Sequence, residues 1–196
     1  MMKNYTLLFE LLLLTALCSC KVLFTQDIRD DLVKNNIDLK KIQYYNSQKI
    51  VLSRFLSSTE TKVTAGEVKL EKGKYIEIVE IKKNTPGVCD SIFEDRLNIK
   101  FEAGPNKYIT FRKTKRYGGY YEMYANEWTK KNILIPLSSE EDINMVNYNL
   151  YTGKVRYDSK MYYTKRYTTK PRLKIKKTGK TKTTRKKRKV KGLRVE

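Results

Sequence analysis

The chain of 196 residues contains no histidine. Histidine is the commonest general base and the commonest metal ligand, so its absence removes every His-dependent triad and the usual metal sites. Carboxylate or Ser/Lys chemistry stays open. However, the sequence has no nucleophile elbow, no glycine-rich phosphate loop and no cysteine pairs with zinc spacing. We interpret the acidic cluster at residues 138–142 as a solvated turn. The sequence therefore predicts a protein that is not an enzyme and that holds no metal or cofactor.

Cysteine is also scarce, with three residues in the whole chain, Cys18, Cys20 and Cys89. The first two lie close together near the N-terminus, and Cys89 is alone in the body of the sequence. No histidine is present to activate its thiol, and a reactive cysteine needs a neighbour that lowers the thiol pKa. We therefore expect Cys89 to be a small apolar filler in a loop.

Long apolar runs are limited to one, from residue 7 to residue 17, which Glu10 and Thr15 interrupt. The run follows a short basic start at Lys3. A transmembrane helix needs about 20 apolar residues, whereas the core of a signal peptide is shorter. The run therefore predicts a signal peptide rather than a membrane-spanning helix.

The run ends in Leu17-Cys18-Ser19-Cys20. These four residues resemble the box of bacterial lipoprotein signals, which places an aliphatic, a variable and a small residue before an invariant cysteine. The resemblance covers only the first 20 residues. It implies that residues 1–19 are removed and that Cys20 carries acyl chains such as palmitate, which attach the protein to a membrane. One alternative is acylation at Cys18, with Leu17 in the place of the small residue. Another is an ordinary cleaved secretory signal.

Two further expectations follow from this resemblance. If Cys20 is acylated and Cys18 is removed, Cys89 is the only thiol left and no internal disulfide can form. The residue after Cys20 is Lys21 rather than aspartate, and residues 21–26 contain no acidic stretch. By the sorting rules of bacterial lipoproteins, this implies an outer-membrane lipoprotein of the cell envelope that faces the periplasm. The abundance of Tyr, Asn and Lys is similar to that of Bacteroidota envelope lipoproteins.

The charge of the chain is +21 and is concentrated at its C-terminus. Residues 170–196 contain 14 Lys or Arg and one Glu, a net charge of +13. Such a segment buries too little apolar surface to repay its ordering entropy, so we predict a disordered polybasic tail over residues 170–196 that binds polyanions. The predicted polyanion-binding residues are Lys174, Lys176, Lys177, Lys180, Lys182, Arg185, Lys186, Lys187, Arg188, Lys189, Lys191 and Arg194.

Between these ends, residues 20–26 are expected to be a lipidated tether and residues 27–169 one β-rich globular domain. A short helix is predicted from Asp27 to Asn35-Asn36, and beyond residue 40 the apolar residues recur with period two. The clearest alternation is at residues 97–101, and a last hairpin is predicted across Thr152-Gly153. The fold class is therefore mainly β, an antiparallel meander that forms a small barrel or a curled sheet.

Aromatic residues are plentiful, with 15 tyrosines. Tyrosines at positions 117, 120, 121 and 124 flank basic residues at 113, 115 and 116, a combination found in single-strand nucleic-acid platforms. Tyrosine is also a good strand residue with one polar end. For an exported chain we favour the strand interpretation and do not expect nucleic acid as a partner.

Taken together, these features predict a lipid-anchored cell-envelope protein that acts as a non-enzymatic adaptor or scaffold component. Its cationic tail would bind an anionic envelope polymer, lipid or an acidic protein partner. One alternative is a ligand-binding β-barrel lipoprotein, which a large apolar cavity would favour and a filled interior would not. The other alternative is a secreted nucleic-acid-binding protein.

Overall fold

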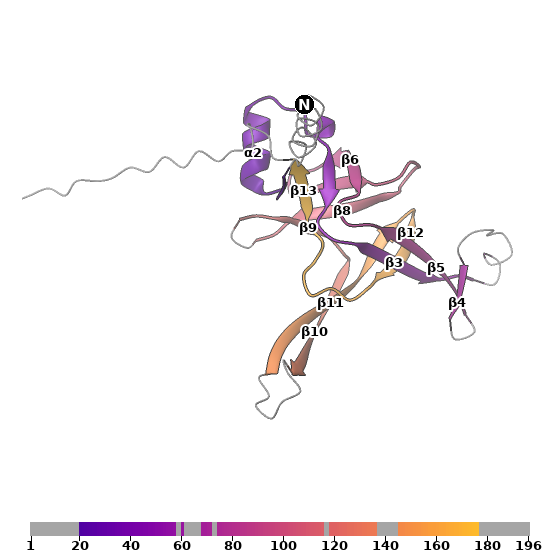
Figure 1. Ribbon diagram of the computed structural model, residues 1–196. Coiled ribbons are helices and arrows are strands. Elements are labelled where there is room, and N and C mark those ends of the chain that lie inside the picture. The colour runs from indigo at the N-terminus through magenta and orange to yellow at the C-terminus, as the bar shows by residue number, and fades with distance from the viewer. Residues whose placement is uncertain are drawn as a thin grey trace, which may run out of the picture.

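A computed structural model describes residues 20–57, 60, 68–71, 74–115, 118–136 and 145–176 (Figure 1). The chain is mainly β, with two antiparallel sheets and one α-helix in the described part, as the alternating sequence pattern predicts. The predicted signal peptide, the acidic cluster and the predicted tail beyond Lys176 lie outside the described residues.

The first sheet has seven strands, in the order β1-β13-β2-β6-β7-β8-β9. Its second half, from β6 to β9, is a meander in which each strand pairs with the next along the chain. Its first half is not local, because β13 from the C-terminal part of the described chain lies between β1 and β2. The strands are β1 (Lys21–Leu23), β13 (Leu173–Lys176), β2 (Tyr44–Asn46), β6 (Pro86–Ile92), β7 (Arg96–Lys100), β8 (Tyr108–Lys113) and β9 (Tyr121–Met123).

The second sheet has six strands, in the order β10-β11-β12-β3-β5-β4. The long pair of β10 and β11 projects from the body as an arm (Figure 1). The strands are β10 (Glu127–Pro136), β11 (Met145–Tyr157), β12 (Lys160–Thr164), β3 (Ile50–Phe55), β5 (Lys74–Ile81) and β4 (Val68–Glu71).

The hairpin predicted across Thr152-Gly153 is wrong, because β11 runs through both residues without turning. Gly153 lies opposite Trp128 of β10. A Cβ atom built on Gly153 would lie 2.7 Å from the Cβ of Ala125 and 3.0 Å from the Trp128 ring. The glycine is therefore needed for close packing between neighbouring segments rather than for a turn.

The predicted N-terminal helix is confirmed, although its start differs. Helix α2 spans Gln26–Lys34, and the Thr25 side chain, not Asp27, caps it by accepting a hydrogen bond from the backbone N–H of Ile28. Asn35 is the C-cap, and Asn36 adopts a positive φ of 55°. A short 3₁₀ helix, η1 (Leu39–Lys41), then leads into β2.

The sheets are not closed into a barrel, which corrects that part of the prediction. Isolated bridges link the region of β9 to the chain beside β1 and β13, between Thr25 and Tyr120 and between Glu122 and Arg172. The ladder cannot be extended past these bridges because Thr25 is already the cap of α2 and Pro171 has no N–H to donate.

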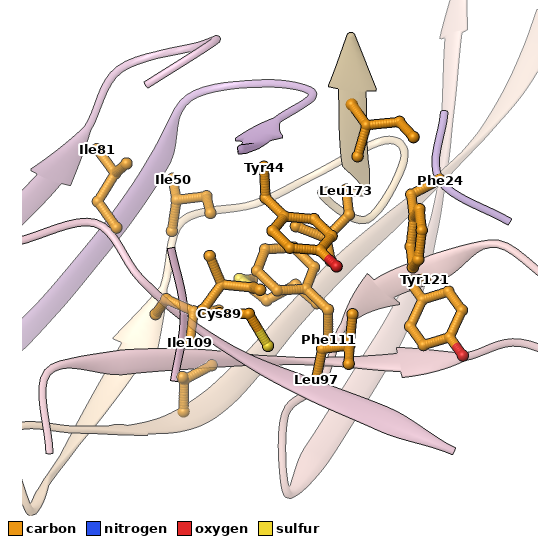
Figure 2. Close-up of a cluster of buried hydrophobic side chains, with 14 of the residues drawn as sticks. Phe24, Tyr44, Ile50, Ile81, Cys89, Leu97, Ile109, Phe111, Tyr121 and Leu173 are labelled. Atoms are coloured by element: carbon orange, nitrogen blue, oxygen red, sulfur yellow. The ribbon is translucent and has the colours of Figure 1, made fainter. Parts of the chain in front are cut away.

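The core lies against the inner face of the seven-stranded sheet (Figure 2). Tyr44 is fully buried near its centre, and the ring of Phe24 packs edge-on against it with a centroid distance of 5.4 Å. Phe24 also contacts Tyr121 at 5.0 Å. The core also includes Ile50, Leu52, Leu97, Ile99, Ile109, Phe111, Met123, Leu173 and Ile175.

The described fold extends beyond residues 27–169 at both ends, with β1 before this range and β13 after it. Residues 20–26 are not a tether, because β1 is a sheet strand and Phe24 is 0% exposed. The folded part also continues past residue 169, since Leu173 and Ile175 are buried in the core. Strand β13 was not predicted from the sequence because this segment is strongly charged. Its apolar residues alternate with lysines, as expected of a strand with one buried face.

Candidate functional site

Cys20 is the first residue that the structure describes. Its side chain is exposed and its thiol is free. Strand β1 begins at the next residue, and Lys21 pairs with Lys176, the last residue of β13. The predicted lipidation residue and Lys176, the last residue of β13, are therefore neighbours at one end of the β1–β13 ladder.

Three lysines at this ladder, Lys21, Lys174 and Lys176, are here called the basic edge. Residues opposite each other in an antiparallel ladder point to the same face of the sheet. Lys21 is opposite Lys176, while Lys174 is opposite both Leu23 and Tyr45. The alternate residues Leu173 and Ile175 point into the core. The three lysines therefore share the outer face of the seven-stranded sheet.

The positive charges of the basic edge are not neutralised by acidic side chains of the described residues. None of its three ammonium groups forms an ion pair with a carboxylate of the described residues. Lys21 instead places its Nζ 4.2 Å from the centroid of the Tyr45 ring, a cation–π contact. The aromatic ring stabilises the position of the Lys21 ammonium group but does not neutralise its charge.

Only two of the twelve predicted polyanion-binding residues belong to the described structure. Lys174 and Lys176 lie in β13, so they are held in a strand and not in a disordered tail. The other ten predicted residues, from Lys177 to Arg194, lie outside the described residues. Sequence reasoning missed Lys21, because its membership of the same face depends on the pairing of β1 with β13.

A second candidate is a hollow of about 250 Å³ where the two sheets meet. Glu102 lies in its wall and accepts a hydrogen bond of 2.6 Å from the Tyr157 hydroxyl. Lys107 lies 3.2 Å from the same carboxylate. The hollow is also lined by Val79, Glu80, Ile81, Lys82, Thr85 and Phe101. Its wall mixes charged and apolar groups, and it is not the large apolar cavity expected of a ligand-binding barrel.

The Glu102–Tyr157 contact links the sheets and shifts the pKa of both groups. The hydrogen bond from Tyr157, with help from Lys107, holds the pKa of the Glu102 carboxyl below its ordinary value. Burial, followed by the adjacent Glu102 carboxylate, raises the pKa of Tyr157. Both shifts favour an ionised carboxylate beside a neutral phenol at neutral pH.

We expect Tyr157→Phe to lower the free energy of unfolding by about 1 kcal/mol at neutral pH, since the carboxylate loses a donor. Because the folded pKa of Glu102 is lowered, its contribution is present above its unfolded pKa of about 4.3 and is lost as the pH falls through the folded pKa. Urea unfolding at a series of pH values should therefore show the variant and the wild type converging in acid. Tyr108→Phe serves as a control, and a deficit that persists unchanged in acid would contradict the assignment.

A buried arginine connects helix α2 to the seven-stranded sheet. Arg29 donates to the carbonyl oxygens of Phe93 and Glu94 at 2.7 and 2.8 Å and to the Tyr121 hydroxyl at 2.7 Å. The Tyr121 hydroxyl in turn donates to Oε1 of Gln26 at 2.8 Å. This fully bonded network fixes α2 on the sheet, and nothing in the local sequence distinguished Arg29 from the other charged residues of the helix.

Two further sequence hypotheses concern side chains that the structure buries. Cys89 is a buried filler, although in strand β6 rather than in a loop, and burial raises the pKa of its thiol to about 11. Tyr121, one of the tyrosines of the suggested nucleic-acid platform, is 0% exposed and so cannot stack on a base. Tyr120 and Tyr124 lie under Arg172 and Arg112 of the same chain.

In comparisons with known proteins, no family model, curated protein or solved structure matches this chain. Among the described residues, no group of three or more Cys, Asp or Glu side chains is placed to hold a metal ion. Within the same residues, no helix has both the length and the apolar character needed to cross a membrane.

Proposed function

We propose that this protein is a lipid-anchored component of a bacterial cell envelope, acylated at Cys20, that acts as a non-enzymatic adaptor or scaffold. The observation that carries the proposal is the position of Cys20. It is exposed and lies directly before β1, at the end of the sequence box Leu17-Cys18-Ser19-Cys20. An acyl chain on this sulfur would extend from the surface of the fold and would disturb no core contact.

The proposed location is the outer membrane, with the body in the periplasm. It rests on Lys21 after the modified cysteine and on the lack of an acidic stretch in residues 21–26. A short spacer is also part of the proposal, since the first residue after Cys20 already belongs to a sheet strand. Such an anchor would hold the seven-stranded sheet close to the bilayer surface rather than on a long flexible arm.

The adaptor proposal is favoured over the ligand-binding one by the interior of the described fold. Large side chains, including the fully buried Tyr44, Phe111 and Tyr162, fill it. The hollow beside Glu102 is small and has a mixed lining. A filled body with a charged surface is suited to contacts with other envelope components.

Replacement of the anchor residue tests the proposal. Cys20→Ala should abolish metabolic labelling with palmitate and leave an unprocessed precursor of lower electrophoretic mobility. The matched controls are Cys18→Ala and Cys89→Ala, which should both be labelled like the wild type. Labelling that persists in Cys20→Ala would contradict the proposal, and labelling lost only in Cys18→Ala would move the anchor to that residue.

A further inference from the structure

We infer that the basic edge docks on anionic phospholipid headgroups of the same bilayer that holds the acyl anchor. The inference rests on the proposed function, because the anchor at Cys20 is what would bring this edge to a membrane. It extends that function by naming the surface of the fold and the chemistry of its partner.

The first support is an unfavourable charge arrangement that an anionic surface would relieve. Lys21 and Lys176 lie directly opposite each other across the β1–β13 ladder, and like charges in such positions destabilise a sheet. No carboxylate of the described residues is ion-paired with either lysine or with Lys174. Headgroup phosphates beside the ladder would neutralise all three ammonium groups without any change in the fold.

The second support is the apolar surface that continues the same face. Pro86 of β6 lies opposite Tyr45 of β2, so it shares the face of the basic edge, and Pro86 is exposed whereas Tyr45 is buried. Two residues further along β6, Val88 is 54% exposed. The acidic residue of this strand region, Asp90, is already paired with Lys100 at 2.6 Å. Lysines beside exposed apolar groups are typical of a surface that lies in a membrane interface.

The third support is the position at which the chain continues. The last 20 residues of the sequence, 177–196, contain ten Lys or Arg and one Glu, and they follow directly on Lys176. This charge therefore starts beside Cys20 and not at a distant end of the molecule. A polybasic segment that begins next to an acyl anchor adds electrostatic attraction to anionic headgroups beside the anchor.

Lysine footprinting on membranes tests the inference. The full chain is reconstituted into vesicles of phosphatidylcholine, with or without phosphatidylglycerol, and the acetylation rate of each lysine is followed by mass spectrometry. Lys21, Lys174 and Lys176 should be acetylated several-fold more slowly on the anionic vesicles, and added salt should remove the protection. The internal controls are Lys130 and Lys131, exposed residues of the β10 arm that projects away from β13 in Figure 1.

Variants give a second measurement. Each basic residue near an anionic bilayer contributes about fivefold to binding. In the Cys20→Ala background, Lys21→Gln/Lys174→Gln/Lys176→Gln should bind phosphatidylglycerol vesicles on the order of 100-fold more weakly than the parent. The matched control, Lys130→Gln/Lys131→Gln/Arg166→Gln, removes the same charge from β10 and from the segment after β12, and it should bind like the parent. Circular dichroism checks that both variants are folded.

The outcomes separate this inference from the proposed function. Palmitate labelling at Cys20 without protection of the basic edge would overturn the docking surface and leave the anchor intact. Protection without labelling would overturn the anchor alone. Equal slowing of all lysines, the control lysines included, would also overturn the inference. Protection that appears only with soluble polyphosphate would assign the edge to an anionic polymer instead of the bilayer.

Discussion

A chain that ends at Lys170 is expected to lose its cooperative unfolding transition, whereas a chain that ends at Lys176 should unfold like the full chain. The shorter chain lacks β13, which lies between β1 and β2 and pairs with both. Loss of one buried Leu or Ile side chain costs about 2–5 kcal/mol. Leu173 is 0% exposed and Ile175 is 2% exposed, so the combined loss is comparable to the whole stability of a domain, about 5–15 kcal/mol.

The measurement is urea unfolding followed by near-UV circular dichroism, which reports the packing of buried tyrosines such as Tyr44 and Tyr121. The chain that ends at Lys176 is the matched control, because it removes ten of the 14 basic residues of the predicted tail while keeping β13. Equal transitions for the chains that end at Lys170 and Lys176 would mean that β13 contributes nothing to the fold. They would restore the domain boundary at residue 170 that the sequence predicts.

Phe24→Ala is expected to lower the free energy of unfolding by about 3–5 kcal/mol. The Phe24 ring is fully buried and packs against Tyr44 and Tyr121, with centroid distances of 5.4 and 5.0 Å. Its backbone N–H also donates to the carbonyl oxygen of Leu173 at 2.9 Å, next to the β1–β13 ladder. Removal of the ring leaves a cavity where the N-terminal segment meets the core.

Chemical denaturation of purified Phe24→Ala and wild-type chains measures this loss. Val33→Ala is a suitable control on helix α2, because Val33 is 55% exposed and its truncation should change stability by no more than about 0.5 kcal/mol. A Phe24→Ala chain as stable as the control would show that residues 20–26 behave as a tether after all.

Local patterns in the sequence predicted those parts of the fold that depend on neighbours along the chain. The alternation at residues 97–101 indicated strand β7, and Asn35-Asn36 marked the end of helix α2. These signals work because side chains alternate in a strand and because asparagine tolerates the positive φ that Asn36 adopts. The mainly β class follows from the same periodicity.

The tertiary structure alone decided which distant segments meet. The three residues of β1 and the four of β13 are too short to be recognised by periodicity, and the lysines of β13 made its composition resemble that of a disordered tail. Their pairing is stabilised by Phe24, Leu173 and Ile175 entering a core built by the intervening chain. The sequence by itself determined the strand pattern, the charge and the cysteine. Cys20 lies beside Lys176 because β13 pairs with both β1 and β2. The sequence could not show this contact, since it depends on long-range packing rather than on local preference.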